Sequence, residues 1–291
     1  MKIATFMHGS AIRLGIVDGD GVVDLAAAAP DLPRDMISFL AAGPPALAAA
    51  RAAAARATSR LALADVRLEA PVPRPGKFLA IGLNYADHVQ ESGMERPWVP
   101  VFFNKQSTCV VGPRADVHLP RASSLLDYEG ELAFVIGRRC RHVPAARAAE
   151  VIAGYTIVDD VSVRDWQLRT PTMTMGKSFD THGPMGPWLV TPDEVGDPHA
   201  LELKTWVNGE LRQRSNTRQL IFDCFAQVEH LSTAFTLEPG DVVTTGTPAG
   251  VGGAMKPPRF LVAGDVVRIE IDRLGTLENR VIAEPESTAI G

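Results

Sequence analysis

The chain has 291 residues with hydrophobic and charged shares of 46% and 22%, values near the globular average that argue against a disordered or fibrous architecture. Its net charge is −5, and Lys and Arg are scattered, so a nucleic-acid or anionic-membrane partner is not expected. The first residues lack the continuous apolar run of a signal peptide or membrane span, and the three cysteines show no CxxC spacing. We therefore expect a cytoplasmic globular protein with a small-molecule partner.

The first part of the chain combines short strands with one helix. Apolar and polar residues alternate in three runs, which predicts a β-meander over residues 3–6, 12–17 and 22–25. The alanine-rich run 45–64, with arginines spaced along it, predicts a helix with a solvated face and no chemistry. Pro71, Pro73 and Pro75 then interrupt regular structure. We expect a small α/β domain over 1–70 and a larger domain over 71–291.

The larger domain is predicted to consist mostly of strands. Apolar runs that end in Gly, Pro or Asp turns predict strands over residues 77–82, 101–103, 131–136, 155–158, 201–207, 242–245 and 266–271. Helical patterns are few, and the clearest of them covers 218–234. No internal repeat has the period of a solenoid or a propeller. The fold class predicted for the whole chain is therefore α+β and β-dominated.

Two glutamates two positions apart enter one of the predicted strands. Side chains alternate between the faces of a strand, so Glu129 and Glu131 share one face. A solvated strand edge is the ordinary explanation of such a pair. A partly buried pair of carboxylates, by contrast, must take up a proton or hold a cation.

A third carboxylate favours the cation. The apolar run 155–158 ends in two acids, Asp159 and Asp160, and a third carboxylate from this segment could complete an oxygen-rich shell with the two glutamates. Oxygen ligands without a nearby His or Cys suit a hard ion, and a shell with open positions for water and substrate favours Mg²⁺ or Mn²⁺ over Zn²⁺. The sequence therefore predicts a site for one of these ions.

Five segments together resemble the signature blocks of the fumarylacetoacetate hydrolase superfamily. They occur in the family's order, from about residue 76 to 282, as GLNYADH (82–88), DYEGE (127–131), DDVSVRDWQ (159–167), GKSFD (176–180) and TGTPAGVG (245–252). The resemblance implies metal ligands at Glu129, Glu131 and Asp160, in agreement with the argument from the carboxylates. It also implies a mixed β-roll for the larger domain and a homodimer as the usual smallest assembly.

The histidine that ends the first of these blocks has a glutamate three positions after it. On a short helix His88 and Glu91 would be neighbours, and a carboxylate beside an imidazole fixes its tautomer and raises its basicity. A lone histidine is more often a surface or satisfied core residue. Hydrolytic members of the family have a similar pair on a lid over the substrate, so the resemblance implies that His88, oriented by Glu91, is a general base.

Two lysines are further candidates. By resemblance Lys177, which would otherwise be an ordinary surface lysine, points at the substrate. Its ammonium could neutralise an enolate or carboxylate oxygen as charge develops. Lys105 is a weaker candidate for substrate binding.

Three polar residues complete the predicted substrate site. The family uses the positions of Arg164 and Gln167 near the metal and the substrate, although an arginine beside three acids could serve only to orient them. The glycine-rich run 244–253 lacks the Gly-Lys-Ser/Thr ending of a P-loop, so nucleotide binding is not indicated. Within that run Thr247 could donate its hydroxyl to a substrate carboxylate. His182 has no motif around it and is expected to be structural.

The combined pattern predicts a metal-dependent hydrolase that cleaves a carbon–carbon bond in a small acidic 1,3-dicarbonyl or acylpyruvate-type 2-oxo acid. The same site without water attack could decarboxylate oxaloacetate or interconvert its keto and enol forms. The runs 176–181 and 256–261 resemble most the branch with diketo sugar-acid hydrolases and oxaloacetate tautomerases, so the substrate stays open. A ureidoglycolate lyase is less favoured because nothing recognises a ureido group. A catalytically silent binding protein is disfavoured because it would have lost some of the family's acidic or basic residues, and each of those that can be placed in this sequence is present.

Overall fold

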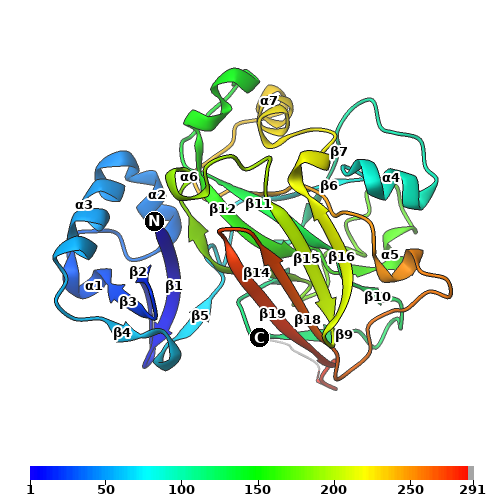
Figure 1. Cartoon of the computed structure of the whole chain (residues 1–291), viewed down its shortest axis with the longest axis horizontal. Helices are drawn as coiled ribbons and strands as arrows, with labels where there is room; N and C mark the ends of the chain where they lie inside the picture. Colours follow the sequence, from blue (N-terminus) through cyan, green and yellow to red (C-terminus); the bar gives the residue numbers. More distant parts are fainter. Residues whose placement is uncertain (288–291) are drawn as a thin grey trace.

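The computed structural model describes residues 1–287 (Figure 1). Within them the strands form a twelve-stranded, a five-stranded and a two-stranded sheet, so the predicted β-dominated α+β fold is confirmed. In the described part of the chain, no helix is long and apolar enough to cross a membrane.

The N-terminal strands form one end of the twelve-stranded sheet. The predicted meander is confirmed, and its antiparallel ladder has the order β4-β3-β2-β1, with β5 also paired to β1. These strands are β1 (Lys2–His8), β2 (Ala11–Asp18), β3 (Gly21–Asp24), β4 (Leu61–Ala62) and β5 (Arg67–Glu69). Helices lie beside them, drawn blue in Figure 1: α1 (Leu25–Ala28), α2 (Met36–Ala41) and α3 (Gly43–Arg56).

The helix predicted over 45–64 is wrong at its C-terminal end, because α3 ends at Arg56. Ala57 already has an extended backbone, with φ −62° and ψ 126°. Leu61 then pairs with Val22 of β3 as part of β4. Strand pairing with the meander therefore overrides the helix propensity of the alanine-rich composition there.

The remaining strands of the large sheet come from the second part of the chain. β14 lies between β1 and β12, with Lys2 opposite Val190, so the N-terminal strands continue the sheet of the larger part. After β1 the order is β14 (Gly183–Val190), β12 (Ile152–Asp159), β11 (Gly130–Ile136), β17 (Val242–Thr244), β6 (Phe78–Gly82) and β7 (Val101–Lys105), and β8 (Val110–Val111) pairs with β14.

The five-stranded sheet packs on one face of the large sheet. In order it contains β16 (Glu210–Asn216), β15 (Glu202–Val207), β18 (Val266–Ile271), β19 (Gly275–Ala283) and β9 (Asp116–Leu119). Leu132 and Phe134 of β11 are fully buried in the same apolar cluster as Leu203 and Ile269 of this sheet. Because side chains alternate along β11, Glu131 points to the opposite face.

Short elements connect the sheets. The two-stranded sheet consists of β10 (Leu126–Asp127) and β13 (Ser162–Val163). The other α-helices in the described residues are α4 (Ala86–Ser92), α5 (Arg164–Gln167), α6 (Pro192–Val195) and α7 (Cys224–Ala234). The 3-10 turns are Leu63–Asp65, Ser107–Cys109, Ala145–Glu150, Thr217–Gln219 and Gly252–Ala254.

The predicted start of the second helix is also wrong, because α7 begins at Cys224 and not at residue 218. The Asp223 side chain caps it by accepting hydrogen bonds from the backbone of Phe225 and Ala226, at 3.0 and 2.8 Å. Before the cap, Leu220 forms a backbone bridge with Tyr85. An N-cap aspartate satisfies the free amides of a first turn, and here it fixes the helix start.

A buried histidine links two layers of this fold. His182 has no exposed surface, its Nε2 lies 2.8 Å from the carbonyl oxygen of His118, and its ring stacks on Phe179. Burial lowers the pKa of His182 to about 3, although the hydrogen bond to His118 opposes the shift. The imidazole is therefore neutral near pH 7 and acts as a structural group.

This low pKa predicts a pH-dependent stability. As pH falls below about 6.5, the unfolded chain binds a proton on His182 and the folded protein does not. The part of the unfolding free energy that comes from this difference is present above that pH and is lost on acidification. Between pH 6 and 4 the unfolding free energy of the wild type should fall by about 1.4 kcal/mol per pH unit more steeply than that of His182→Gln. Chemical denaturation at several pH values measures both slopes, and equal slopes would contradict the prediction.

Candidate active site

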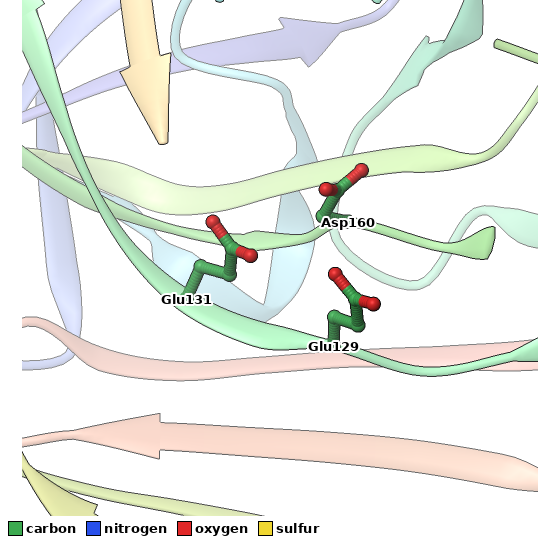
Figure 2. A group of neighbouring side chains, drawn as sticks. All are labelled: Glu129, Glu131 and Asp160. Carbon is green, nitrogen blue, oxygen red and sulfur yellow. The ribbon is translucent and has the colours of Figure 1, made fainter. Parts of the chain in front are cut away.

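Three carboxylates meet where β11 and β12 lie side by side. Glu131 is in β11, Glu129 precedes it, and Asp160 follows β12. The Asp160 amide donates a hydrogen bond of 2.9 Å to the Glu129 carbonyl, which places the two residues opposite each other. The three side chains converge on the face turned away from the five-stranded sheet (Figure 2). One oxygen from each lies within 4.8 Å of the others, and all three residues are buried.

Two buried lysines hold these carboxylates. Lys177, between α5 and β14, donates from Nζ to Glu129 Oε2 at 2.7 Å and to Asp160 Oδ2 at 2.8 Å. Lys105, at the end of β7, donates from Nζ to Asp160 Oδ1 at 2.7 Å and to the carbonyl of Lys177. Both predicted lysines therefore lie in the cluster, but Lys105 mainly contacts a carboxylate and the backbone.

Arg164, the first residue of α5, contacts two carboxylates of this region. Its Nε and Nη2 lie 2.8 and 2.7 Å from Asp127 Oδ2, and its Nη1 donates to Glu129 Oε1 at 2.6 Å. The same Nη1 also donates to Gln167 Oε1 at 2.9 Å. Arg164 thus orients both Glu129 and Gln167, and Gln167 lies beside the cluster.

The environment shifts the pKa values of the carboxylates in different directions. Burial raises the pKa of Glu131 well above its ordinary value, and the negative charges of Asp160 and Glu129 raise it further. Burial also disfavours the charged form of Glu129, but Lys177 and Arg164 outweigh it and lower the pKa to about 2. Burial raises the pKa of Asp159, whose side chain accepts from the Glu129 amide, to about 7.

Lys177 keeps its charge in this environment. Burial lowers the pKa of a lysine, but the carboxylates of Asp160 and Glu129 outweigh burial and raise the pKa of Lys177 above its usual value. The side chain is therefore an ammonium near pH 7. It can stabilise negative charge, and it is not suited to accept a proton.

The charges of the cluster fit a divalent cation. Five buried carboxylates, Asp127, Glu129, Glu131, Asp159 and Asp160, face the three cations Lys105, Lys177 and Arg164, which leaves an excess of two negative charges if all are ionised. Burial, together with the charges of Asp160 and Glu129, raises the pKa values of Glu131 and Asp159 and so opposes this excess. An ion with two positive charges would balance it, and oxygen-only ligands suit Mg²⁺ or Mn²⁺.

The His88–Glu91 pair lies at the rim of the cluster. Both residues are on α4, as predicted, and His88 Nδ1 lies 2.9 Å from Glu91 Oε2. Glu91 Oε1 accepts a hydrogen bond of 2.8 Å from the Gly250 amide, which ties α4 to the glycine-rich segment. After burial, Lys177 and Arg164, His88 also contributes to the pKa of Glu129, so the ring is within electrostatic reach of it. With Nδ1 donating to Glu91, Nε2 has a free lone pair.

The glycine-rich segment after β17 contacts both ends of the cluster. Glu131 Oε2 accepts from the Gly246 amide at 2.8 Å and from the Thr244 hydroxyl. Asp127 accepts from the amides of Gly252 and Gly253 at 2.8 and 2.9 Å. Gly246 has φ +96°, in the region that favours glycine, and a side chain there would meet Asn84. The segment therefore binds carboxylates of the protein itself.

Thr247 takes part in a buried network. Its hydroxyl donates to the Gly130 carbonyl at 3.1 Å and accepts from Gln213 Nε2 at 2.8 Å. Gln213 Oε1 in turn accepts from the Gly130 amide at 3.0 Å. The Thr247 hydroxyl, which was expected to donate to a substrate carboxylate, thus donates to the Gly130 carbonyl at the start of β11.

Sequence reasoning did not select Asp127, Asp159, Thr244 or Gln213, all of which support the cluster. The two aspartates stand inside the signature segments, next to an apolar strand, so their position was a usable signal. Gln213 lies in β16, far from any motif, and only the packing of β16 against β11 brings it to Gly130. Nothing local in the sequence marks such a contact.

The family model described as "Fumarylacetoacetate (FAA) hydrolase C-terminal" matches residues 77–282, and the model "Rv2993c-like, N-terminal" matches residues 1–71. The chain belongs to the fumarylacetoacetate hydrolase family and is an enzyme.

Among its relatives is the mitochondrial oxaloacetate tautomerase fahd2 of Xenopus laevis, 44% identical over 97% of this chain and 90% of that protein. Two solved structures share the fold, each 36% identical and covering 98% of this chain and 100% of the other. One is the maleylpyruvate hydrolase of Sphingobium sp. SYK-6 in complex with manganese(II) and pyruvate, with a TM-score of 0.83. The other is the fumarylacetoacetate hydrolase of Exiguobacterium antarcticum, with a TM-score of 0.86.

Glu131→Gln tests the cluster directly. Because burial and the charges of Asp160 and Glu129 raise the pKa of Glu131 and so disfavour its charged form, the neutral amide should be tolerated, with an unfolding free energy within about 1 kcal/mol of the wild type in chelator. Affinity for Mn²⁺ should fall by at least ~10- to 100-fold, the loss typical of changes near a bound metal. Calorimetric titration and thermal unfolding measure these effects. The exposed Glu150→Gln is the matched control, and equal Mn²⁺ affinity in both variants would contradict the assignment.

Proposed function

We propose that this enzyme hydrolyses a carbon–carbon bond in a small acidic 1,3-dicarbonyl or acylpyruvate-type 2-oxo acid. The observation that carries the proposal is the His88–Glu91 pair beside a buried carboxylate–lysine cluster. The His88–Glu91 pair can orient a base for water, and the carboxylate–lysine cluster, with its metal ion, can bind a chelating 2-oxo acid. The maleylpyruvate hydrolase, solved with manganese(II) and pyruvate, supports this substrate class.

Glu129, Glu131 and Asp160 would hold the Mg²⁺ or Mn²⁺ ion, because they offer the convergent oxygen ligands of the cluster. When bound, such an ion polarises the carbonyl of a 2-oxo acid and stabilises negative charge on its oxygen. Lys177, charged and buried beside two of these carboxylates, adds a fixed positive charge where an enolate develops. Arg164 keeps Glu129 and Gln167 in place, and Gln167, Thr247 and Lys105 are proposed as further polar groups near the substrate.

His88 is the proposed general base. Glu91 accepts a hydrogen bond from Nδ1–H and so keeps the Nε2 lone pair available to remove a proton from water, and its charge stabilises the imidazolium that forms. The resulting hydroxide attacks the distal carbonyl carbon, the bond to the neighbouring carbon breaks, and that carbon keeps the electron pair as an enolate. His88 can then return the proton to the enolate carbon.

A second candidate is keto–enol tautomerisation or decarboxylation of oxaloacetate at the same site. The names of the relatives favour it, since oxaloacetate tautomerases of Xenopus laevis and Rattus norvegicus are 44% and 45% identical to this chain. Both reactions pass through an enolate of a 2-oxo acid, which Lys177 can stabilise. They differ in the need for an activated water, which only hydrolysis has.

Activity on oxaloacetate and on a panel of acylpyruvates should disappear in excess chelator and return with Mg²⁺ or Mn²⁺. The reason is that Glu129, Glu131 and Asp160 offer convergent oxygen ligands for a hard divalent ion, and the proposed reactions need such an ion to polarise the substrate carbonyl. Spectrophotometric assays of each substrate before and after metal addition measure the effect. Full turnover in excess chelator would exclude the metal-dependent mechanism.

Replacement of His88 separates the two reactions. His88→Ala should lower acylpyruvate cleavage by about 10²- to 10⁴-fold, the usual contribution of a general base, while oxaloacetate tautomerisation or decarboxylation stays measurable. The exposed His142→Ala is the matched control and should retain both activities. An equal loss of both reactions would mean that one base serves them, and unchanged cleavage would remove His88 from the mechanism.

We also propose that the enzyme is a homodimer, because the family resemblance implies one and several large apolar side chains stay exposed in a single chain, Trp98 to 89% and Leu168 to 81%. Light scattering should report about twice the chain mass of 31.2 kDa, and a monomer at working concentration would refute the proposal.

The proposed division into domains 1–70 and 71–291 is supported by the two separate family-model matches. The cytoplasmic location stays a prediction.

A further inference from the structure

A cavity of about 380 Å³ lies in the N-terminal part of the molecule, away from the carboxylate cluster. All residues that line it come from positions 8–61: the facing ends of β1, β2 and β3, helices α1 and α3, and the segment that follows α3. A volume of this size is within the range of small-ligand sites in proteins. None of its residues has a part in the proposed reaction.

The cavity has an excess of positive charge in a chain whose net charge is −5. Arg13, Arg56 and Arg60 line it, and Asp24 is the one carboxylate among the lining residues. Both oxygens of Asp24 are engaged, because Oδ1 accepts from the Ala26 amide at 2.8 Å and Oδ2 pairs with Arg13. An anion therefore meets little repulsion there.

The three arginines differ in how far they are neutralised. Arg60 pairs with Asp18 at 2.8 Å, and Asp18 is itself 63% exposed. Within residues 1–287, Arg56 has no carboxylate at salt-bridge distance, whereas Arg51, on the same helix, pairs with Asp193 at 2.9 Å. The guanidinium of Arg56 is thus available to a ligand.

The rest of the lining suits a small organic anion. The hydroxyls of Thr58 and Ser59 and the ring of His8 supply neutral hydrogen-bonding groups. Alanines of α1 and α3 also line the cavity, among them the exposed Ala27 and the buried Ala53, and they add apolar surface. A carboxylate or phosphoryl group would bind the arginines, and a short carbon chain would contact the alanines.

We propose that this cavity is a second binding site, specific for a small organic anion with a carboxylate or phosphoryl group and a short apolar part. Charge-assisted hydrogen bonds from guanidinium groups provide the affinity, and the planar Arg56 fork matches either kind of oxygen group. The site is formed by the N-terminal strands and helices alone, so its occupancy does not depend on the metal.

Binding is tested on the full-length protein in chelator, so that the carboxylate cluster holds no ion that could attract the probe. Inorganic phosphate and butyrate are titrated by calorimetry, with neutral butyramide as the uncharged control. Hydrogen exchange is followed on the peptides that cover residues 56–61. We expect heat and added protection with at least one anion, none with butyramide, and weaker binding as salt is raised. The stronger of the two anions identifies the preferred oxygen group.

Arg56→Gln should weaken the binding by about tenfold or more, as loss of a hydrogen bond from a charged group does. Arg51→Gln is the matched control, because it removes the same charge from the same exposed helix outside the cavity. Arg56 also lies in the last turn of α3, where a cation stabilises the helix, so binding and not stability is the readout. No binding of either anion, or equal affinity in the two variants, would overturn the proposal.

Discussion

Burying acidic side chains at the ends of β11 and β12 is the constraint on which the rest of the site depends. A buried carboxylate is costly unless it is paired, and here several share one small region. Lys177, Lys105 and Arg164 meet part of that cost through short contacts with Asp160, Glu129 and Asp127. Glu129, Glu131 and Asp160 remain as a convergent group of buried carboxylates that is suited to bind a divalent cation.

The surrounding backbone keeps these charges in place. The antiparallel pairing of β11 and β12 puts Glu129 opposite Asp160, and the face of β11 that carries Leu132 is fixed by the apolar contact with the five-stranded sheet. The glycine-rich segment after β17 supplies amides to Glu131 and to Asp127. The large sheet therefore sets the direction of the side chains, and the segment adds hydrogen bonds that a solvent-exposed strand end would lack.

The proposed chemical roles of Lys177 and His88 follow from their charge and from the hydrogen bonds they already make. Lys177 stays charged, because the neighbouring carboxylates raise its pKa, and it serves as a fixed cation. His88 is held through Nδ1 and keeps Nε2 free, so it is the group suited to accept a proton. The link from Glu91 to Gly250 makes the position of this base depend on the glycine-rich segment. In the proposed reactions Lys177 would stabilise the enolate, and in hydrolysis His88 would activate the water.

The sequence by itself determined the strand-rich class, the shared face of Glu129 and Glu131 and the spacing of His88 and Glu91, because these depend on local periodicity. Asp160 was selected through the family resemblance, since it follows a different strand. Only the tertiary structure decided the order of the strands. β14, with prolines at 184 and 187, does not look like a central strand, yet it lies between β1 and β12, where the ladder is irregular. Likewise Leu61 leaves the helix pattern to pair with Val22, and Gln213 reaches Gly130. Such contacts join residues far apart in the chain, and local patterns carry no information about them.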